Sequence, residues 1–126
     1  MIFDSDVMIW AFRGNKNALN EIDHADSRAI SSVTYMELLQ GVRNKDEMRE
    51  MKKFLSKLSF SILPVTTNIS NRAISIMEEC ALKSELGVCD SLIFATACET
   101  GDTLLSGNKK HFKEVAFLTA SEFKPE

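Results

Sequence analysis

The chain has 126 residues, 44% hydrophobic and 26% charged, a composition ordinary for one folded domain with a single core. It leaves no room for a second domain, and no apolar stretch approaches the roughly 20 residues that span a bilayer, so we expect residues 1–126 to form one cytoplasmic domain. A formal net charge of −3 argues against broad, charge-driven nucleic-acid binding, because contacts of Lys and Arg with phosphates dominate such affinity. An acidic cluster that holds a divalent cation escapes this objection, since the cation itself would face the phosphate.

A buried strand at Met1–Phe3 is the first predicted element, because this run is apolar on both faces. The chain then turns helical through Val7–Trp10. Ligands of open α/β sheets bind at the carboxyl ends of strands, so Asp4 is a candidate site residue. Ser5 or Asp6 would cap the helix behind it, and the alternative is that both aspartates serve only as caps or turn residues.

Two helices and a strand are predicted next, a polar helix over 15–25, a strand over 28–31 and a helix over 33–43. In the last of these, the apolar positions leave Glu37 off the centre of the apolar stripe, so Glu37 points toward an edge or cleft. Thr34-Tyr-Met-Glu37 also fits a capping box, in which Glu bonds back to the amide of the cap residue. Taken alone, this spacing favours the cap.

An amphipathic helix is predicted over 46–58, with Met48, Met51 and Phe54 on its apolar side. Unbranched Met side chains adapt to a partner, so this stripe is a candidate docking surface, and packing on the domain's own core is the alternative. A third strand over 60–65, closed by Pro64, and a long helix over 69–84 follow.

The stretch 87–98 is nearly all small or apolar, which predicts a buried helix. Asp90 opens it, either as a first-turn acid favoured by the helix dipole or as a site residue. A fourth strand over 103–106 and a short helix from Gly107 complete the pattern. The alternation of strands and helices predicts an α/β fold with three layers, α/β/α, and a short, mostly parallel central sheet.

The cysteines and histidines offer no alternative catalytic set. Cys80, Cys89 and Cys98 have no C-x-x-C spacing and lie among apolar neighbours, which favours buried thiols over a disulfide framework or a zinc site. His24 lies in a polar stretch typical of the surface, and no Ser/His/Asp or Cys/His arrangement is evident.

Four segments, in this order, resemble a PIN domain over essentially the whole chain. The size and the Glu-Leu-x-x-Gly segment are similar to the VapC-type toxins of toxin–antitoxin pairs. The four segments are Asp4-Ser-Asp-Val-Met-Ile, Ser32-Val-Thr-Tyr-Met-Glu37-Leu-Leu-Gln-Gly41, Asp90-Ser-Leu-Ile-Phe-Ala-Thr-Ala and Leu105-Ser-Gly-Asn108-Lys-Lys-His-Phe112.

The resemblance implies an endoribonuclease that depends on Mg²⁺ or Mn²⁺. It places the family's acidic quartet on Asp4, Glu37, Asp90 and the segment 108–111, with Asp4 and Asp90 as core metal ligands and Glu37 binding directly or through water. Hard divalent ions prefer such oxygen ligands. The fourth position departs from the family's pattern, because His111 stands where many members have Asp. Asn108 matches the family's asparagine and would orient a ligand or water.

The same resemblance implies an RNA substrate, a cognate antitoxin protein and a homodimer. Ser106, Lys109 and Lys110 are candidate substrate-binding residues. Arg13 and Arg43 are further candidates for RNA phosphates, with ordinary surface bases as the alternative for each basic residue.

Two other classes of function remain open from the sequence. One is a PIN fold that has lost catalysis and serves as a binding module, for which His111 is the best support. The other is a phosphatase of the haloacid dehalogenase type, which also begins with a strand followed by D-x-D-x-T/V. Asp4-Ser-Asp-Val-Met8 comes close to that pattern, although Met8 breaks it and no later paired-aspartate motif follows.

Overall fold

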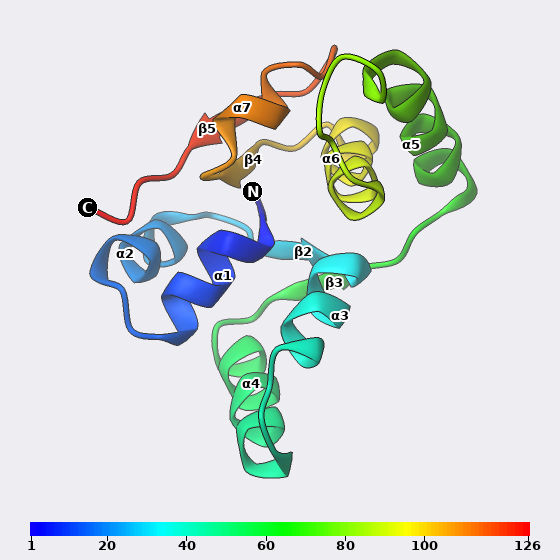
Figure 1. Ribbon diagram of the computed structural model, residues 1–126. Helices are drawn as coiled ribbons and strands as arrows, with labels where there is room; N and C mark the ends of the chain where they lie inside the picture. Colours follow the sequence, from blue (N-terminus) through cyan, green and yellow to red (C-terminus); the bar gives the residue numbers. More distant parts are fainter.

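A five-stranded sheet lies at the centre of the computed structural model, which describes residues 1–126 (Figure 1). All four strand pairs are parallel, and the strand order is β3-β2-β1-β4-β5. The strands are β1 (Ile2–Phe3), β2 (Ala29–Ser31), β3 (Ser61–Leu63), β4 (Leu104–Ser106) and β5 (Ala120–Glu122). The helices are α1 (Ser5–Phe12), α2 (Lys16–His24), α3 (Ser32–Gln40), α4 (Lys45–Lys57), α5 (Thr67–Cys80), α6 (Val88–Thr100) and α7 (Lys109–Phe112).

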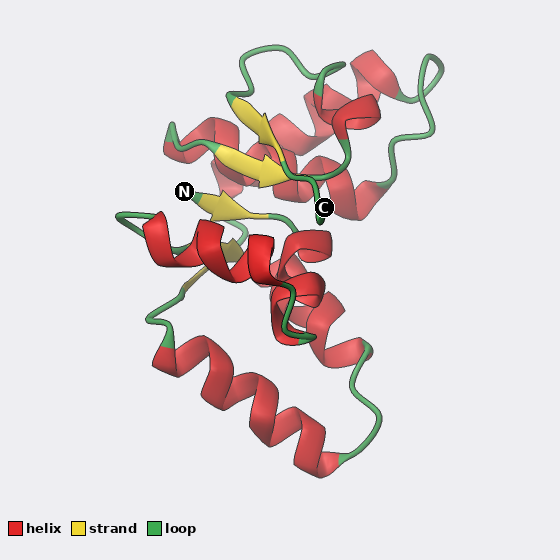
Figure 2. Ribbon diagram, turned by 90° about the vertical axis from the view of Figure 1, so that its left-hand side faces the viewer, coloured by secondary structure: helices red, strands yellow, loops and turns green.

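Helices cover both faces of the sheet, which confirms the predicted three-layer α/β/α architecture (Figure 2). Successive strand residues face opposite sides, so Ile2 and Leu104 pack in one core with α5 and α6, whereas Phe3 and Leu105 pack in the other with α1, α2 and α4. These four side chains are at most 2% exposed. Apolarity on both faces of the strand is therefore what a doubly covered sheet requires.

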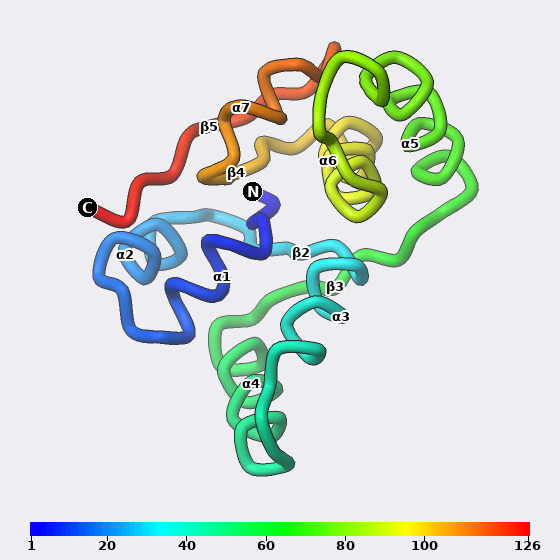
Figure 3. The backbone as a smooth tube through the Cα atoms, viewed as in Figure 1, coloured from blue at the N-terminus to red at the C-terminus, as the bar shows by residue number.

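The order of the strands fixes where a ligand would bind. From β1 the chain builds outward through β2 to β3, then crosses over through α5 and α6 to β4 on the other side of β1. Such a reversal opens a crevice at the carboxyl ends of the two central strands. Asp4 follows β1 directly, and Gly107 follows β4. In the tube of Figure 3 the blue start of α1 and the orange segment after β4 lie close together.

Several local predictions are wrong. Thr34 lies inside α3, which begins after Ser31, whose hydroxyl accepts from the Val33 N–H, so Thr34 and Glu37 form no capping box. Cys89 is exposed rather than buried. The strand β5 has no counterpart among the predicted elements, because it is three residues long and two of them are exposed.

The Met stripe of α4 packs largely on the domain itself, which is the alternative that the sequence left open. Met51 is 4% exposed and belongs to the core beneath α1, and the ring of Phe54 packs edge-on against Phe12 with centroids 5.6 Å apart. Met48 is half-buried. None of the helices has the length and apolar character that crossing a membrane requires.

Candidate active site

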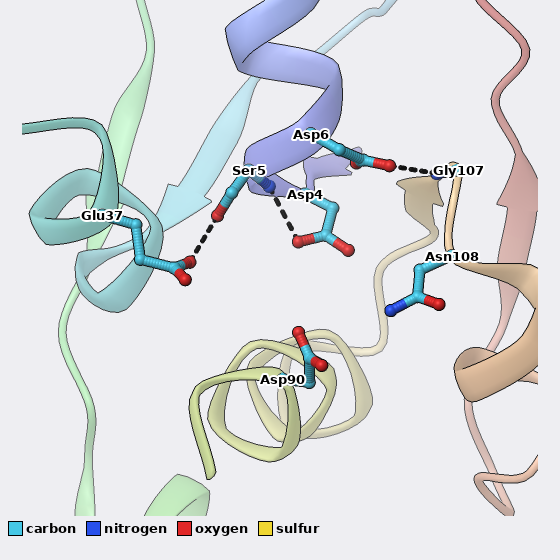
Figure 4. Close-up of a pocket in the computed structure, with 7 residues that line it drawn as sticks. All are labelled: Asp4, Ser5, Asp6, Glu37, Asp90, Gly107 and Asn108. Carbon is cyan, nitrogen blue, oxygen red and sulfur yellow. Dashed lines mark hydrogen bonds between the residues drawn. The ribbon is translucent and has the colours of Figure 1, made fainter. Parts of the chain in front are cut away.

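A polar cleft with a volume of about 420 Å³ opens at the carboxyl ends of β1 and β4. No hydrophobic residue lines it, and four of its seven residues are acidic. Figure 4 shows the start of α1 at its centre, with α3, α6 and the loop after β4 supplying the other side chains. The lining residues are Asp4, Ser5, Asp6, Glu37, Asp90, Gly107 and Asn108.

Asp4 lies at the base of this cleft and is only 5% exposed. Its Oδ1 accepts from the backbone N–H of Ser5 at 2.7 Å, so the residue that caps α1 is Asp4 itself rather than Ser5 or Asp6. Its Oδ2 accepts from the Ser106 hydroxyl at 2.7 Å. The pKa of Asp4 is raised from 3.8 to about 7, chiefly because the buried carboxylate loses hydration. The negative charges of Asp6 and Asp90 add to this rise, and the hydrogen bonds from Ser106 and Ser5 oppose it.

Glu37 reaches the cleft from the middle of α3. The Ser5 hydroxyl donates to its Oε1 at 2.5 Å, a contact between residues 32 positions apart in the sequence (Figure 4). The same Ser5 hydroxyl lies 3.3 Å from the Thr34 hydroxyl, one turn before Glu37. The carboxylate of Glu37 is therefore held at the edge of the cleft by a tertiary contact, in agreement with its position beside the apolar stripe.

Asp90 stands in the first turn of α6, opposite Asp4 (Figure 4). The residue that caps α6 is Gly87, and no side chain makes a capping hydrogen bond there. Asp90 is half-buried, and no hydrogen bond to its carboxylate ties it to the helix backbone. Its carboxylate thus faces the cleft without serving as a cap.

Asp6, like Ser5, lines the cleft although the sequence predicted it only as a helix cap. Its Oδ1 accepts from the Val7 N–H at 2.8 Å, and its Oδ2 accepts from the Gly107 N–H at 2.9 Å (Figure 4). Burial raises the pKa of Asp6 above its ordinary value, with these N–H groups opposing the change and the charge of Asp90 adding to it. The spacing Asp-x-Asp at the end of a strand was the available signal, since both carboxylates then start the same helix.

Asn108 enters the cleft from the loop after β4, while Ser106 lies beneath it. Ser106 is fully buried, and besides donating to Asp4 its hydroxyl accepts from the Asn108 N–H at 3.0 Å. His111 does not line the cleft: its Nδ1 lies 2.9 Å from Asn108 Nδ2 and 3.7 Å from Asp90 Oδ2.

The four basic residues predicted to contact RNA phosphates lie in different parts of the structure. Lys109 and Lys110 are exposed on α7, directly after Asn108. Arg13 lines a separate small groove beside α1. Arg43 pairs with Glu47 at 3.1 Å and is absent from the cleft lining.

The donor set fits a hard divalent cation held through few protein ligands. No three acidic, histidine or cysteine side chains converge as a ready-made metal cage. Mg²⁺ nevertheless usually keeps several waters and is bound by one or two carboxylates plus a substrate phosphate. Asp4 and Asp90 face one another across a cleft without hydrophobic lining. A cation between them would offset both the lost hydration that chiefly raises the pKa of Asp4 and the smaller contribution of the Asp90 charge.

Comparison with known proteins gives a consistent picture. A family model described as the PIN domain matches residues 1–118. The fold is similar to a chain in the crystal structure of VapBC2 from Rickettsia felis bound to a promoter DNA fragment, with a TM-score of 0.86, 22% identity, and coverage of 98% of this chain and 100% of that chain. It is also similar to a chain of DNA-bound VapBC from Salmonella typhimurium, with a TM-score of 0.81, 20% identity and 96% coverage of each chain. A toxin–antitoxin complex from Klebsiella pneumoniae contains a third similar chain, with a TM-score of 0.76, 24% identity, and coverage of 99% of this chain and 97% of that one. Comparison with curated protein sequences gives no significant match.

Proposed function

We propose that this chain, which belongs to the PIN domain family, is an endoribonuclease dependent on Mg²⁺ or Mn²⁺ and the toxin of a toxin–antitoxin pair. The observation that carries the nuclease proposal is the cleft with four acidic and no hydrophobic lining residues, in which the pKa of Asp4 is raised to about 7, chiefly by burial. Such a perturbed acid in a cleft, facing a second carboxylate, is characteristic of functional sites.

In this proposal three acidic residues serve the cation. Asp4 and Asp90 would hold it, and Glu37 would bind it directly or through water. A cation bound there would supply Lewis acidity for the attack of water on the phosphodiester and for the leaving oxygen. Ser106 keeps Asp4 in place through the 2.7 Å hydrogen bond, and Ser5 keeps Glu37 at the edge of the cleft.

Asn108, Lys109 and Lys110 complete the substrate side of the proposed site. The Asn108 side chain lies in the cleft, where its amide would orient a water or the RNA backbone. The two exposed lysines follow it on α7 and would contact phosphates on one side of the scissile bond. Local basic residues of this kind are compatible with the net charge of −3, because they act beside a bound cation rather than over a broad surface.

The nuclease proposal is tested by incubating the purified chain with total RNA in Mg²⁺, in Mn²⁺ and in EDTA, and by resolving the products. We expect cleavage with either cation and none in EDTA. Asp90→Asn should abolish cleavage. Asp26→Asn, which neutralises an exposed acid outside the cleft, is its matched control and should cleave as wild type does. Hydrolysis of small phosphate esters without RNA cleavage would instead favour the phosphatase, and RNA binding without cleavage would favour the binding module.

The toxin proposal requires an inhibitor. Because the Met stripe of α4 is largely buried, we expect the inhibitor to dock elsewhere. A small groove of about 120 Å³ runs between α1, α3 and α4, and five of its nine residues are hydrophobic. Glu37 lines both this groove and the acidic cleft, so the two lie side by side. An antitoxin helix would lay apolar side chains over Ile9 and Phe12 and extend an Arg toward the carboxylates, whose geometry a guanidinium matches bidentately.

The antitoxin is tested by co-expressing the chain with the protein encoded by the adjacent gene. We expect co-purification and loss of RNA cleavage, and Ile9→Asp should release the partner while leaving cleavage intact, because Ile9 is 38% exposed and outside the cleft. A partner that binds without suppressing cleavage would favour a stand-alone RNA-processing nuclease. We further propose a homodimer, which light scattering on the purified chain would measure.

A further inference from the structure

Two hydrogen bonds hold the loop after β4, one made by Gly107 and one by the side chain of Asn108. The Gly107 N–H donates to Asp6 Oδ2 at 2.9 Å. Asn108 Nδ2 lies 2.9 Å from His111 Nδ1. The first bond joins the loop to α1 and the second joins it to α7. We refer to this pair of contacts as the Asn108 clamp.

We propose that Asp6 and His111 are positioning residues, which together hold the side-chain amide of Asn108 in the cleft. This arrangement belongs to a chain that has histidine rather than a carboxylate at position 111. Neither residue is a metal ligand in this proposal. Its consequence for catalysis rests on the proposed nuclease function, whereas the clamp itself is a property of the fold that is measurable without RNA.

The Asp6 contact requires a glycine at position 107. A Cβ placed on Gly107 would lie 2.5 Å from Asp6 Oδ2, closer than real Cβ contacts occur, and 3.4 Å from the Phe123 carbonyl oxygen. The absence of a side chain thus lets the Asp6 carboxylate reach the backbone N–H. With Oδ1 already accepting from Val7, the carboxylate bridges the start of α1 to the loop.

The His111 contact explains why an imidazole occupies a poorly hydrated position. Its side chain is 16% exposed, and Nε2 is buried without a hydrogen-bond partner. When Nδ1 accepts from the Asn108 amide, the neutral ring carries its hydrogen on Nε2. A buried N–H without a partner lowers the stability of the fold, and a phenylalanine at this position would avoid that loss. Histidine differs from phenylalanine here by the hydrogen bond that its Nδ1 makes to Asn108.

The first experiment separates the two ring nitrogens. In His111→Asn the side-chain oxygen stands near the position of Nδ1, whereas His111→Gln places its amide near Nε2, so only the former keeps the acceptor for Asn108. The readout is the side-chain NH₂ resonance of Asn108, identified by its loss in Asn108→Ala. We expect its chemical shift and protection from exchange to survive in His111→Asn and to be lost in His111→Gln, with His24→Gln as the control because His24 is exposed.

The same variants connect the clamp to the proposed catalysis. Loss of a group that orients residues around a metal site typically lowers metal affinity or activity about 10–100-fold. We expect a loss of this size in turnover for His111→Gln, with His111→Asn restoring most of it and KM for RNA little changed. Equal activity and equal Asn108 resonances in the two variants would overturn the role of His111. If the Asn108 resonance responds to the two variants as expected but the wild-type chain cleaves no RNA, the nuclease proposal would be overturned and the clamp would stand.

The second experiment tests Asp6 by a double-mutant cycle. Gly107→Ala and Asp6→Ala should each disturb the Asn108 resonance and lower turnover about 10–100-fold. Together they should cost little more than either alone, because the added methyl group acts by displacing the Asp6 carboxylate. Fully additive losses in turnover, or an undisturbed resonance in folded Asp6→Ala, would show that Asp6 does not position the loop.

Discussion

Replacing Asp4 with asparagine should stabilise the cation-free protein at neutral and alkaline pH. The pKa of Asp4 lies at about 7 in the folded chain against an ordinary value of 3.8, chiefly because the carboxylate is buried. The folded state therefore binds the proton more tightly than the unfolded state does. The stability that this proton provides is fully present below pH 3.8 and is lost as the pH rises through about 7.

The size of the effect follows from the same two values. One pH unit corresponds to about 1.36 kcal/mol, so the difference between 3.8 and about 7 amounts to at most about 4 kcal/mol in the free energy of unfolding. Asp4→Asn carries no charge at any pH, and its amide can still accept from Ser5 and donate to Ser106. Between about pH 5 and about pH 8, wild type should lose about 2–3 kcal/mol relative to the variant.

The assay is urea denaturation followed by circular dichroism, in EDTA, at several pH values for both proteins. Asp26→Asn is the control, because an exposed carboxylate is already hydrated and its removal should leave no pH-dependent gap. Adding Mg²⁺ at about 100 times its dissociation constant should return about 2.7 kcal/mol to wild type but little to Asp4→Asn. A gap between wild type and Asp4→Asn that stays constant with pH would refute the reasoning.

Three further changes test other parts of the site. Ser106→Ala should cost about 1–3 kcal/mol of stability above pH 7, measured by urea denaturation, because Asp4 Oδ2 then loses its buried donor; an unchanged midpoint would contradict this. The Asp4→Asn/Asp90→Asn variant should lose both the Mg²⁺-induced thermal shift and RNA cleavage, and residual cleavage at the wild-type rate would exclude both residues as the metal ligands. Lys109→Ala and Lys110→Ala should each weaken RNA binding and reduce the slope of log K against log salt by about 0.7, measured by fluorescence anisotropy on a single-stranded RNA; an unchanged slope would remove these lysines from the interface.

The layers of the fold could be predicted from the sequence because its central strand β1 is buried on both faces. The run Ile2–Phe3 is apolar at both positions, as a strand covered on two sides must be, and the structure places these residues in two separate cores. The short polar strand β5 escaped prediction for the converse reason. Its residues gain little from burial, and it is held by pairing with β4, which no local pattern encodes.

The site was predictable only in part, because its side chains are fixed by contacts between distant residues. The position of Asp4 at the end of a strand is a local feature and was identified from the sequence. The bond between Ser5 and Glu37 spans 32 positions, and the bond between Asp6 and Gly107 spans 101. Local spacing therefore suggested a capping box at Glu37 and a simple cap at Asp6, where the structure has tertiary contacts that build the cleft.

The most direct measurement is single-turnover cleavage of a labelled RNA as a function of Mn²⁺ concentration, in wild type and in Asp90→Asn. We predict that cleavage by wild type saturates with Mn²⁺ and is abolished by EDTA. Asp90→Asn should remain folded by circular dichroism and cleave at no measurable rate at the same Mn²⁺ concentrations. Cleavage by wild type that is independent of the cation, or equal rates in the two proteins, would contradict the assignment of this cleft as a cation-dependent ribonuclease site.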